Sequence, residues 1–143
     1  MAARTRTLLV KTIWRMHRLI YQASSGRVWG RIVGMPVLIL HTVGHKTGQW
    51  RGTMLTYIPF EDGYLIAASN GGADTSPDWF RNLQAESKAR IQIGGEKIDV
   101  VARVTKDKER AALWKKFKQA YAGYGRYEQR TARVIPVILL TPD

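Results

Sequence analysis

A glycine-framed, basic turn between two apolar runs constrains the fold of this 143-residue chain more than any other stretch. The apolar run from Val37 to Val43 is long enough for a buried strand, and a second run begins near Thr53. Between them lies the sequence G-H-K-T-G-Q-W-R, which runs from Gly44 to Arg51. We therefore predict an antiparallel hairpin with a basic tip.

The tip of this hairpin has the chemistry of an anion site. Gly44 and Gly48 can adopt positive φ and let the main chain approach a ligand closely, while Lys46 and Arg51 place two permanent cations beside the exposed amides. A phosphate is the anion that fits such a tip best. The competing interpretation is an ordinary solvated hairpin whose charges only keep a sheet edge soluble.

The charge of the chain is high and unevenly placed. The sequence has 23 Lys or Arg and 11 Asp or Glu, a formal net charge of +12, and no acidic residue precedes Glu61. This asymmetry predicts an anionic partner: a membrane surface, a nucleic acid or a polyanionic small molecule. The absence of cysteine excludes thiol chemistry, and the three histidines (His17, His41 and His45) lack the spacing of a metal motif, so no metal site is expected.

Residues 1–30 are predicted to form a basic amphipathic helix and a loop, ahead of one barrel domain over residues 31–143. Apolar residues recur at helical spacing from Arg4 to Ala23, and basic residues fall on the opposite face. Charge interrupts this helix too often for it to span a bilayer. Its apolar stripe can pack on the domain or lie in the headgroup region of a membrane, and both interpretations stay open.

The rest of the chain alternates between short strands and turn residues. Strands are predicted for residues 37–43, 53–60, 64–68, 88–93, 97–104 and 134–140, and helices for residues 76–87 and 106–121. Ser76 is the expected side-chain cap of the first helix, and Pro136 places the last strand at an edge or a bulge. About six mostly antiparallel strands without βαβ alternation favour an α+β fold, a small closed or split barrel with helices around it.

Three tyrosines, Tyr121, Tyr124 and Tyr127, stand three residues apart around Gly123 and Gly125. The glycines predict a break in the helix, so the three hydroxyls can line one side of a short turn and clamp a flat substrate. Alternatively, the rings fill the gap between helix and barrel. Neither a pair of acids nor a Ser-His-Asp order points to hydrolysis, so a cofactor is expected to carry the reactive atom.

Four motifs in order resemble the deazaflavin-dependent nitroreductase family. They are G-H-K-T-G-Q-W-R at 44–51, A-S-N-G-G at 68–72, P-D-W-F-R-N-L at 77–83, and Y-x-x-Y-x-x-Y at 121–127 with R-x-I-P-V at 133–137. The resemblance covers essentially the whole chain. It implies a split β-barrel oxidoreductase of the actinobacterial type that uses reduced coenzyme F420, whose phosphate and oligoglutamate tail suit a basic protein.

The resemblance also implies the residues of the site. It assigns cofactor binding to His45, Lys46, Thr47, Gly48, Arg51, Met54, Leu55, Thr56, Ser69, Asn70, Gly71, Gly72, Trp79 and Asn82. It assigns Tyr121, Tyr124 and Tyr127 to a substrate wall, and Ser69 to hydrogen bonding or protonation of the acceptor. Arginine, proline and lysine are common in the family where this chain has His45, Met54 and Asn70. Thr56 replaces a tyrosine of the nitroreductase itself, so reduction of nitroimidazoles is not implied.

The implied activity is transfer of a hydride from the reduced deazaflavin to an electron-poor acceptor, with a quinone favoured over nitroaromatics and enones. The accompanying proton would come from water or from a hydroxyl such as that of Tyr124 or Ser69. We expect a cytoplasmic monomer rather than a homodimer, with peripheral contact to the inner face of the cell membrane through the N-terminal helix. The alternatives are an FMN-using split-barrel oxidoreductase and a basic lipid- or nucleic-acid-binding module without turnover, although no nucleic-acid motif is present.

Overall fold

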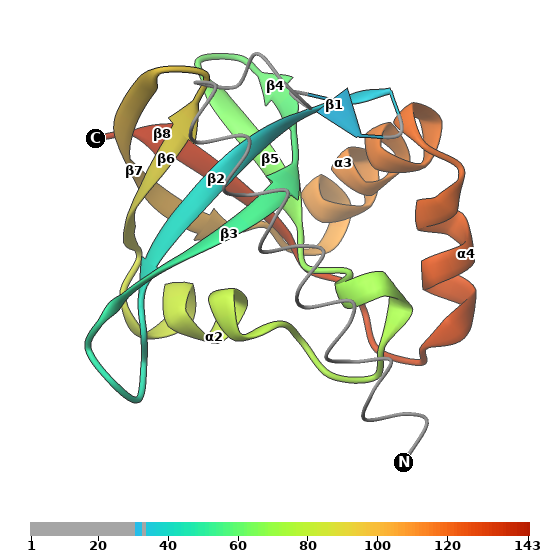
Figure 1. Cartoon of the computed structure of the whole chain (residues 1–143). Helices are drawn as coiled ribbons and strands as arrows, with labels where there is room; N and C mark the ends of the chain where they lie inside the picture. Colours follow the sequence, from blue (N-terminus) through green and yellow to red (C-terminus); the bar gives the residue numbers. More distant parts are fainter. Residues whose placement is uncertain (1–30, 33) are drawn as a thin grey trace.

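The computed structural model describes residues 31–32 and 34–143, so the helix predicted within residues 1–30 lies outside the described part (Figure 1). Eight strands lie within these residues: β1 (Arg31–Ile32), β2 (Met35–Val43), β3 (Trp50–Thr56), β4 (Ile58–Phe60), β5 (Gly63–Ala67), β6 (Lys88–Ile93), β7 (Glu96–Val104) and β8 (Val137–Pro142). The helices described are the 3-10 helix η1 (Asn70–Gly72), α2 (Asp78–Ala85), α3 (Asp107–Ala120) and α4 (Gly123–Arg130).

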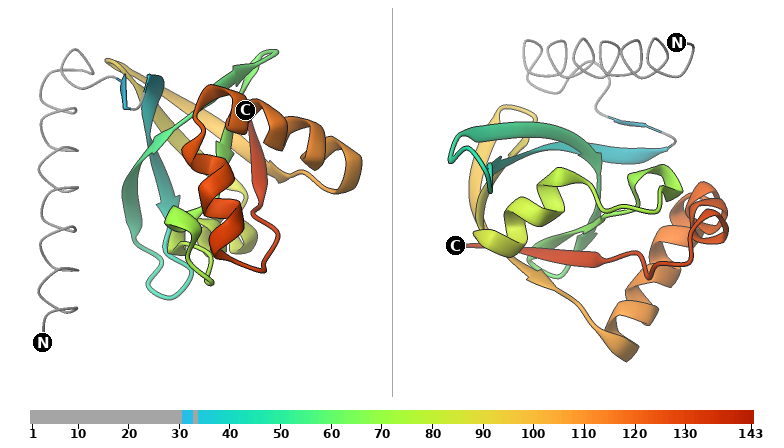
Figure 2. Two further views of the ribbon diagram at one scale, coloured as in Figure 1. Left: turned by 90° about the vertical axis from the view of Figure 1, so that its right-hand side faces the viewer. Right: turned by 90° about the horizontal axis from the view of Figure 1, so that it is seen from below.

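The strands form one curled antiparallel sheet. Their order is β1-β2-β6-β7-β8-β5-β4, and β3 pairs with β2. Strand β4 lies at one end of this order, and β3 pairs with β2 near the other end. The single residue Tyr57 joins β3 to β4, so the sheet curls back on itself (Figure 2). The predicted split β-barrel with helices around it is confirmed.

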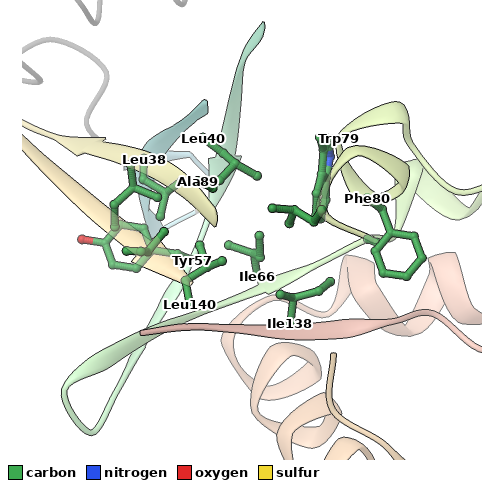
Figure 3. Close-up of a cluster of buried hydrophobic side chains, with 13 residues drawn as sticks. Leu38, Leu40, Tyr57, Ile66, Trp79, Phe80, Ala89, Ile138 and Leu140 are labelled. Atoms are coloured by element: carbon green, nitrogen blue, oxygen red, sulfur yellow. The ribbon is translucent and has the colours of Figure 1, made fainter. Parts of the chain in front are cut away.

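Side chains of β5 and β8 alternate between two cores, because successive residues of a strand point to opposite faces. Ile66 and Ile138 belong to the core inside the barrel, whereas Leu65 and Val137 belong to a second core shared with α3 and α4. The fully buried residues of the barrel core are Leu38, Leu40, Ile66, Ala68, Ile91, Val100, Ile138 and Leu140. Trp79 and Phe80 enter the same cluster from α2, so this helix packs on the barrel core (Figure 3).

The strand predicted over residues 53–60 is two strands, because the chain changes its pairing partner at Tyr57. Thr56 pairs with Val37 of β2, whereas Ile58 pairs with Leu65 of β5. Together with the two-residue β1, this break explains why eight strands are found where about six were expected.

Two local predictions were wrong. Strand β8 lies between β7 and β5, so Pro136 marks no sheet edge; it precedes the strand, and its carbonyl accepts a bond from the Ala68 amide at 2.9 Å. A proline is tolerated there because sheet pairing begins only at Val137. Helix α2 has no side-chain cap, and the Ser76 hydroxyl accepts instead from Arg133 at 3.5 Å.

Candidate functional site

The predicted site segments lie along one side of the molecule. In Figure 1 the tip between β2 and β3, then α2, then η1 follow one another along the lower edge, and α4 stands at the right. Direct contacts join the tip to α2 and η1 to α4.

The hairpin tip is tied together by its own main chain. The Gly44 amide donates to the Gln49 carbonyl at 2.7 Å, and the Gly48 amide donates to the Gly44 carbonyl at 2.8 Å. Gly48 has φ +71°, as predicted for a tip glycine. The amides of Lys46 and Thr47 meet no acceptor among residues 31–32 and 34–143, and both side chains are exposed. Two unpaired amides beside the exposed Lys46 suit an anion.

Asn82 fastens this tip to α2. Its side chain is 4% exposed, and its Oδ1 accepts from the His45 amide at 2.9 Å and lies 2.5 Å from the His45 ring Nδ1. Its Nδ2 donates to the Thr42 hydroxyl at 3.0 Å. Because Oδ1 is an acceptor, the Nδ1 of His45 carries the proton of that contact. Asn82 and His45, which the resemblance assigned to cofactor binding, contact each other in the structure.

The Ser69–Gly72 loop lies directly on α4. Gly72 has φ +83°, and a Cβ at this position would lie 2.9 Å from both the Cα and the carbonyl oxygen of Tyr127. Only a glycine allows so close an approach. Arg130 of α4 also donates to the Gly71 carbonyl at 3.3 Å. The loop and α4 therefore form one packed unit.

The three tyrosines form a chain of edge contacts across the break between α3 and α4. The ring centroids of Tyr121 and Tyr124 lie 5.9 Å apart, and those of Tyr124 and Tyr127 lie 5.7 Å apart. Arg126 and Arg130 lie over the outer two rings, at 5.8 Å and 5.7 Å from their centroids. The predicted break is confirmed, since α3 ends at Ala120 and α4 begins at Gly123.

Tyr124 differs from its two neighbours because its ring belongs to the core. It is 7% exposed and packs against Trp114 and Phe117, so the packing alternative describes this ring. Its hydroxyl lies 2.6 Å from the Thr56 hydroxyl at the end of β3. Burial raises the pKa of Tyr124 above its ordinary value, while the bond to Thr56 acts in the opposite direction. Tyr121 and Tyr127 are only partly buried.

The residues that follow the hairpin alternate between the two faces of β3. Leu55 pairs with Leu38 and packs on the barrel core. Trp79 of α2 belongs to the same core. Met54 lies on the other face, in a cluster with Val37 and Ile39. Thr56, two residues further, shares that face. Thr56 is therefore the residue of this stretch that meets the tyrosines, while Leu55 and Trp79 support the barrel from inside.

Arg133 is the residue of this region to which the sequence assigned no role. It stands first in the R-x-I-P-V motif, and in the structure its guanidinium donates to groups at both ends of the Ser69–Gly72 loop. The only signal in the sequence was the motif itself, since the partners are 57 to 65 residues away.

Replacing Tyr124 with phenylalanine is expected to cost about 1 kcal/mol through the lost bond to Thr56. Because burial raises the folded pKa of Tyr124 above its ordinary 10.0, the phenol contributes stability that is complete below that pH and is lost as pH rises through the folded pKa. The unfolding free energy, measured in urea from about pH 8 to 11, should fall less steeply in Tyr124→Phe than in the parent chain. Identical slopes would contradict this account of the buried hydroxyl.

The curled antiparallel sheet and its flanking helices define a protein of the split β-barrel class. More narrowly, the chain belongs to the F420H(2)-dependent quinone reductase family, whose sequence profile matches residues 13–142. Coenzyme F420 is the cofactor of this family, and the activity is that of an oxidoreductase.

Known proteins agree with this assignment. An F420H(2)-dependent quinone reductase of Mycobacterium tuberculosis (strain H37Rv) is 43% identical over 131 residues, which cover 89% of this chain and 88% of the relative. The solved structure of an F420-H2 dependent reductase, FDR-A, superposes with a TM-score of 0.67 at 32% identity, over 73% of this chain and 93% of that chain. A structure described as a domain-swapped dimer has a TM-score of 0.69 at 29% identity, over 94% of this chain and 98% of that chain.

Among residues 31–32 and 34–143 no helix has the length and apolar character needed to cross a membrane. The same residues contain no group of three or more His, Cys, Asp or Glu side chains that could hold a metal ion.

Proposed function

We propose that this chain binds the phosphate and acidic tail of coenzyme F420 at the tip of the β2–β3 hairpin and reduces a quinone. The observation that carries the proposal is the pair of unpaired amides at Lys46 and Thr47, on a tip that also bears the exposed cations Lys46 and Arg51. Gly48 and Thr47 shape the turn, and Asn82 holds it against α2 through His45.

The ring of the cofactor is proposed to lie near the Thr56 end of β3, the Ser69–Gly72 loop and the tyrosines. Bound there in its reduced form, coenzyme F420 supplies a hydride to an electron-poor acceptor. Tyr121 and Tyr127 offer partly exposed rings against which a flat quinone can stack. Met54, Leu55 and Trp79 support these segments from the two faces of the sheet.

Ser69 is the better candidate than Tyr124 for holding or protonating the acceptor oxygen. The Tyr124 hydroxyl is buried and bonded to Thr56, whereas Ser69 lies half-buried in the loop that follows β5. A general acid must lie within hydrogen-bond reach of the atom that it protonates. Tyr124 then acts by keeping Thr56 and α4 together.

The test is oxidation of reduced coenzyme F420 by a menaquinone analogue, followed by the deazaflavin absorbance. We expect turnover by the parent chain, and about a tenfold weaker cofactor affinity in Lys46→Ala, since the lost contact is charge-assisted. Part of that difference should disappear as salt is raised from about 0.05 to 0.2 M. Lys97→Ala is the matched control, because Lys97 is also an exposed lysine. It lies near the start of β7, just after the glycine turn of the β6–β7 hairpin.

Three outcomes would refute the proposal. The first is no oxidation across a panel of quinones, enones and nitroaromatics. The second is tighter binding of FMN than of coenzyme F420 with no loss in Lys46→Ala, which would favour the FMN alternative. Salt-dependent DNA binding without cofactor binding would favour the non-catalytic alternative.

The surroundings of the enzyme are proposed from its charge and its relatives. A cytoplasmic location is proposed, with peripheral membrane contact through residues 1–30, because the basic N-terminal part of the sequence suits an anionic lipid surface. The domain-swapped dimer among the similar structures counts against the predicted monomer. Flotation of the full chain on vesicles with and without anionic lipid checks the contact, and light scattering measures the oligomeric state.

A further inference from the structure

Arg133 donates to four groups that flank η1. Its Nη2 donates to the carbonyls of Ala68 and Ser69, at 3.1 Å and 2.9 Å, where the chain leaves β5. Its Nε donates to the Ala73 carbonyl at 2.9 Å, and its Nη1 lies 3.5 Å from the Ser76 hydroxyl, beyond η1. One planar side chain therefore joins the two ends of the loop.

The charge of Arg133 acts on peptide groups rather than on a carboxylate. None of the salt bridges within residues 31–32 and 34–143 includes it, and Asp74 is the acidic residue whose charge it feels. Hydrogen bonds from a cation are shorter and stronger than neutral ones. The loop carbonyls of Ala68, Ser69 and Ala73 are thus held by a charged donor.

Bonding the two consecutive carbonyls fixes the direction of the amides that follow them. In a trans peptide the N–H points opposite to the C=O, so the amides of Ser69 and Asn70 point away from Arg133. Ser69 has φ −73° and ψ −33°, and Asn70 has φ +47°, a succession that makes neighbouring amides converge. Neither amide meets an acceptor in the part of the chain that the structure describes.

We propose that Arg133 is a positioning residue that orders the Ser69–Gly72 loop and turns the amides of Ser69 and Asn70 toward a carbonyl or anionic oxygen of the bound deazaflavin. This inference rests on the proposed function. Arg133 itself lies on the opposite side of these peptide groups and acts through them. Arg130 adds a single bond, to the Gly71 carbonyl.

Amide hydrogen exchange, read residue by residue by NMR, tests the ordering without any cofactor. The amides of Gly72 and Ala73 donate to the carbonyls of Ser69 and Asn70 at 2.9 Å and 3.1 Å, so they report on loop order. In Arg133→Met they should exchange about tenfold faster or more, because local opening becomes easier. The Gly44 and Gly48 amides of the hairpin tip should keep their rates.

Cofactor binding tests the second half of the inference. We expect coenzyme F420 to slow exchange at Ser69 and Asn70 in the parent chain, and to bind Arg133→Met about tenfold more weakly. Guanidinium added to Arg133→Ala should restore part of the affinity, which a merely structural loss would not allow. Arg103→Met is the matched control, since Arg103 makes an exposed bidentate pair with Glu109 on the α3 side.

Several results would overturn the proposal. Unchanged exchange at Gly72 and Ala73, or unchanged affinity in Arg133→Met, removes the positioning role. Binding of coenzyme F420 without any effect on the Ser69 and Asn70 amides removes their role as donors. Arg133→Lys keeps the positive charge but lacks the planar, forked guanidinium. If both Arg133→Met and Arg133→Lys unfold, Arg133 is a residue of global stability instead. If the parent chain does not bind coenzyme F420, the proposed function fails, whereas faster Gly72 and Ala73 exchange still supports the ordering.

Discussion

Gly72→Ala is expected to lower the free energy of unfolding by about 2–5 kcal/mol. Two costs combine. The residue has φ +83°, where an L side chain is strained, and the new Cβ would lie 2.9 Å from the Cα and carbonyl oxygen of Tyr127. These are backbone atoms of α4, so the loop and the helix must separate. Cofactor affinity should fall as well, because the separation displaces the Ser69–Gly72 loop.

Gly71→Ala is the matched control for this prediction. Gly71 has φ +64° in the same loop, but a Cβ there would meet nothing within 4 Å. Its cost should be limited to the backbone term, about 1–2 kcal/mol. Urea unfolding of both variants measures the difference. Equal losses would show that α4 yields to the added methyl group and that the contact between loop and helix is unimportant.

Asn82→Ala is expected to lower both stability, by about 2–3 kcal/mol, and cofactor affinity, by about tenfold or more. The change removes the acceptor of the His45 amide and ring and the donor to the Thr42 hydroxyl. The hairpin tip then loses its attachment to α2, although Lys46 and Arg51 are untouched. Urea unfolding measures the loss of stability, and a cofactor titration measures the loss of affinity.

Asn82→Asp separates the attachment from the charge of the tip. An aspartate keeps an acceptor for His45, and the Thr42 hydroxyl can turn to donate to the second oxygen. We expect stability within about 1 kcal/mol of the parent chain, because the bonds are retained. Affinity should still fall, since a carboxylate now competes with the phosphate for the cations of the tip. Full affinity in Asn82→Ala would show that the attachment does not serve binding.

Local patterns predicted most of the fold. The hairpin of β6 and β7 follows from two alternating strands around Gly94, and its register pairs Ile93 with Glu96. The break between α3 and α4 follows from the low helix propensity of Gly123 and Gly125. The basic tip follows from six consecutive polar or glycine residues between apolar runs. In each case the signal lies within a few residues of the structure that it predicts.

The strand predictions failed where they depended on which strands pair with each other. Residues 53–60 form one mostly apolar run and were predicted as a single strand, although at Tyr57 the pairing partner changes from β2 to β5. Pro136 suggested an edge, because a proline has no amide to donate, yet it sits just outside the paired part of a central strand. Sheet order depends on segments that are distant in sequence, and a local pattern does not encode it.

By itself, then, the sequence determined the antiparallel barrel and the basic character of the tip, because alternation, turn residues and charge are local properties. The family followed from the resemblance of four motifs in order. Only the tertiary structure decided what the site residues contact. Asn82 meets His45 across 37 positions, Thr56 meets Tyr124 across 68, and Arg133 reaches Ala68 across 65. Such pairs have no periodicity to reveal them, since their geometry exists only once the barrel has closed and the helices have packed on it.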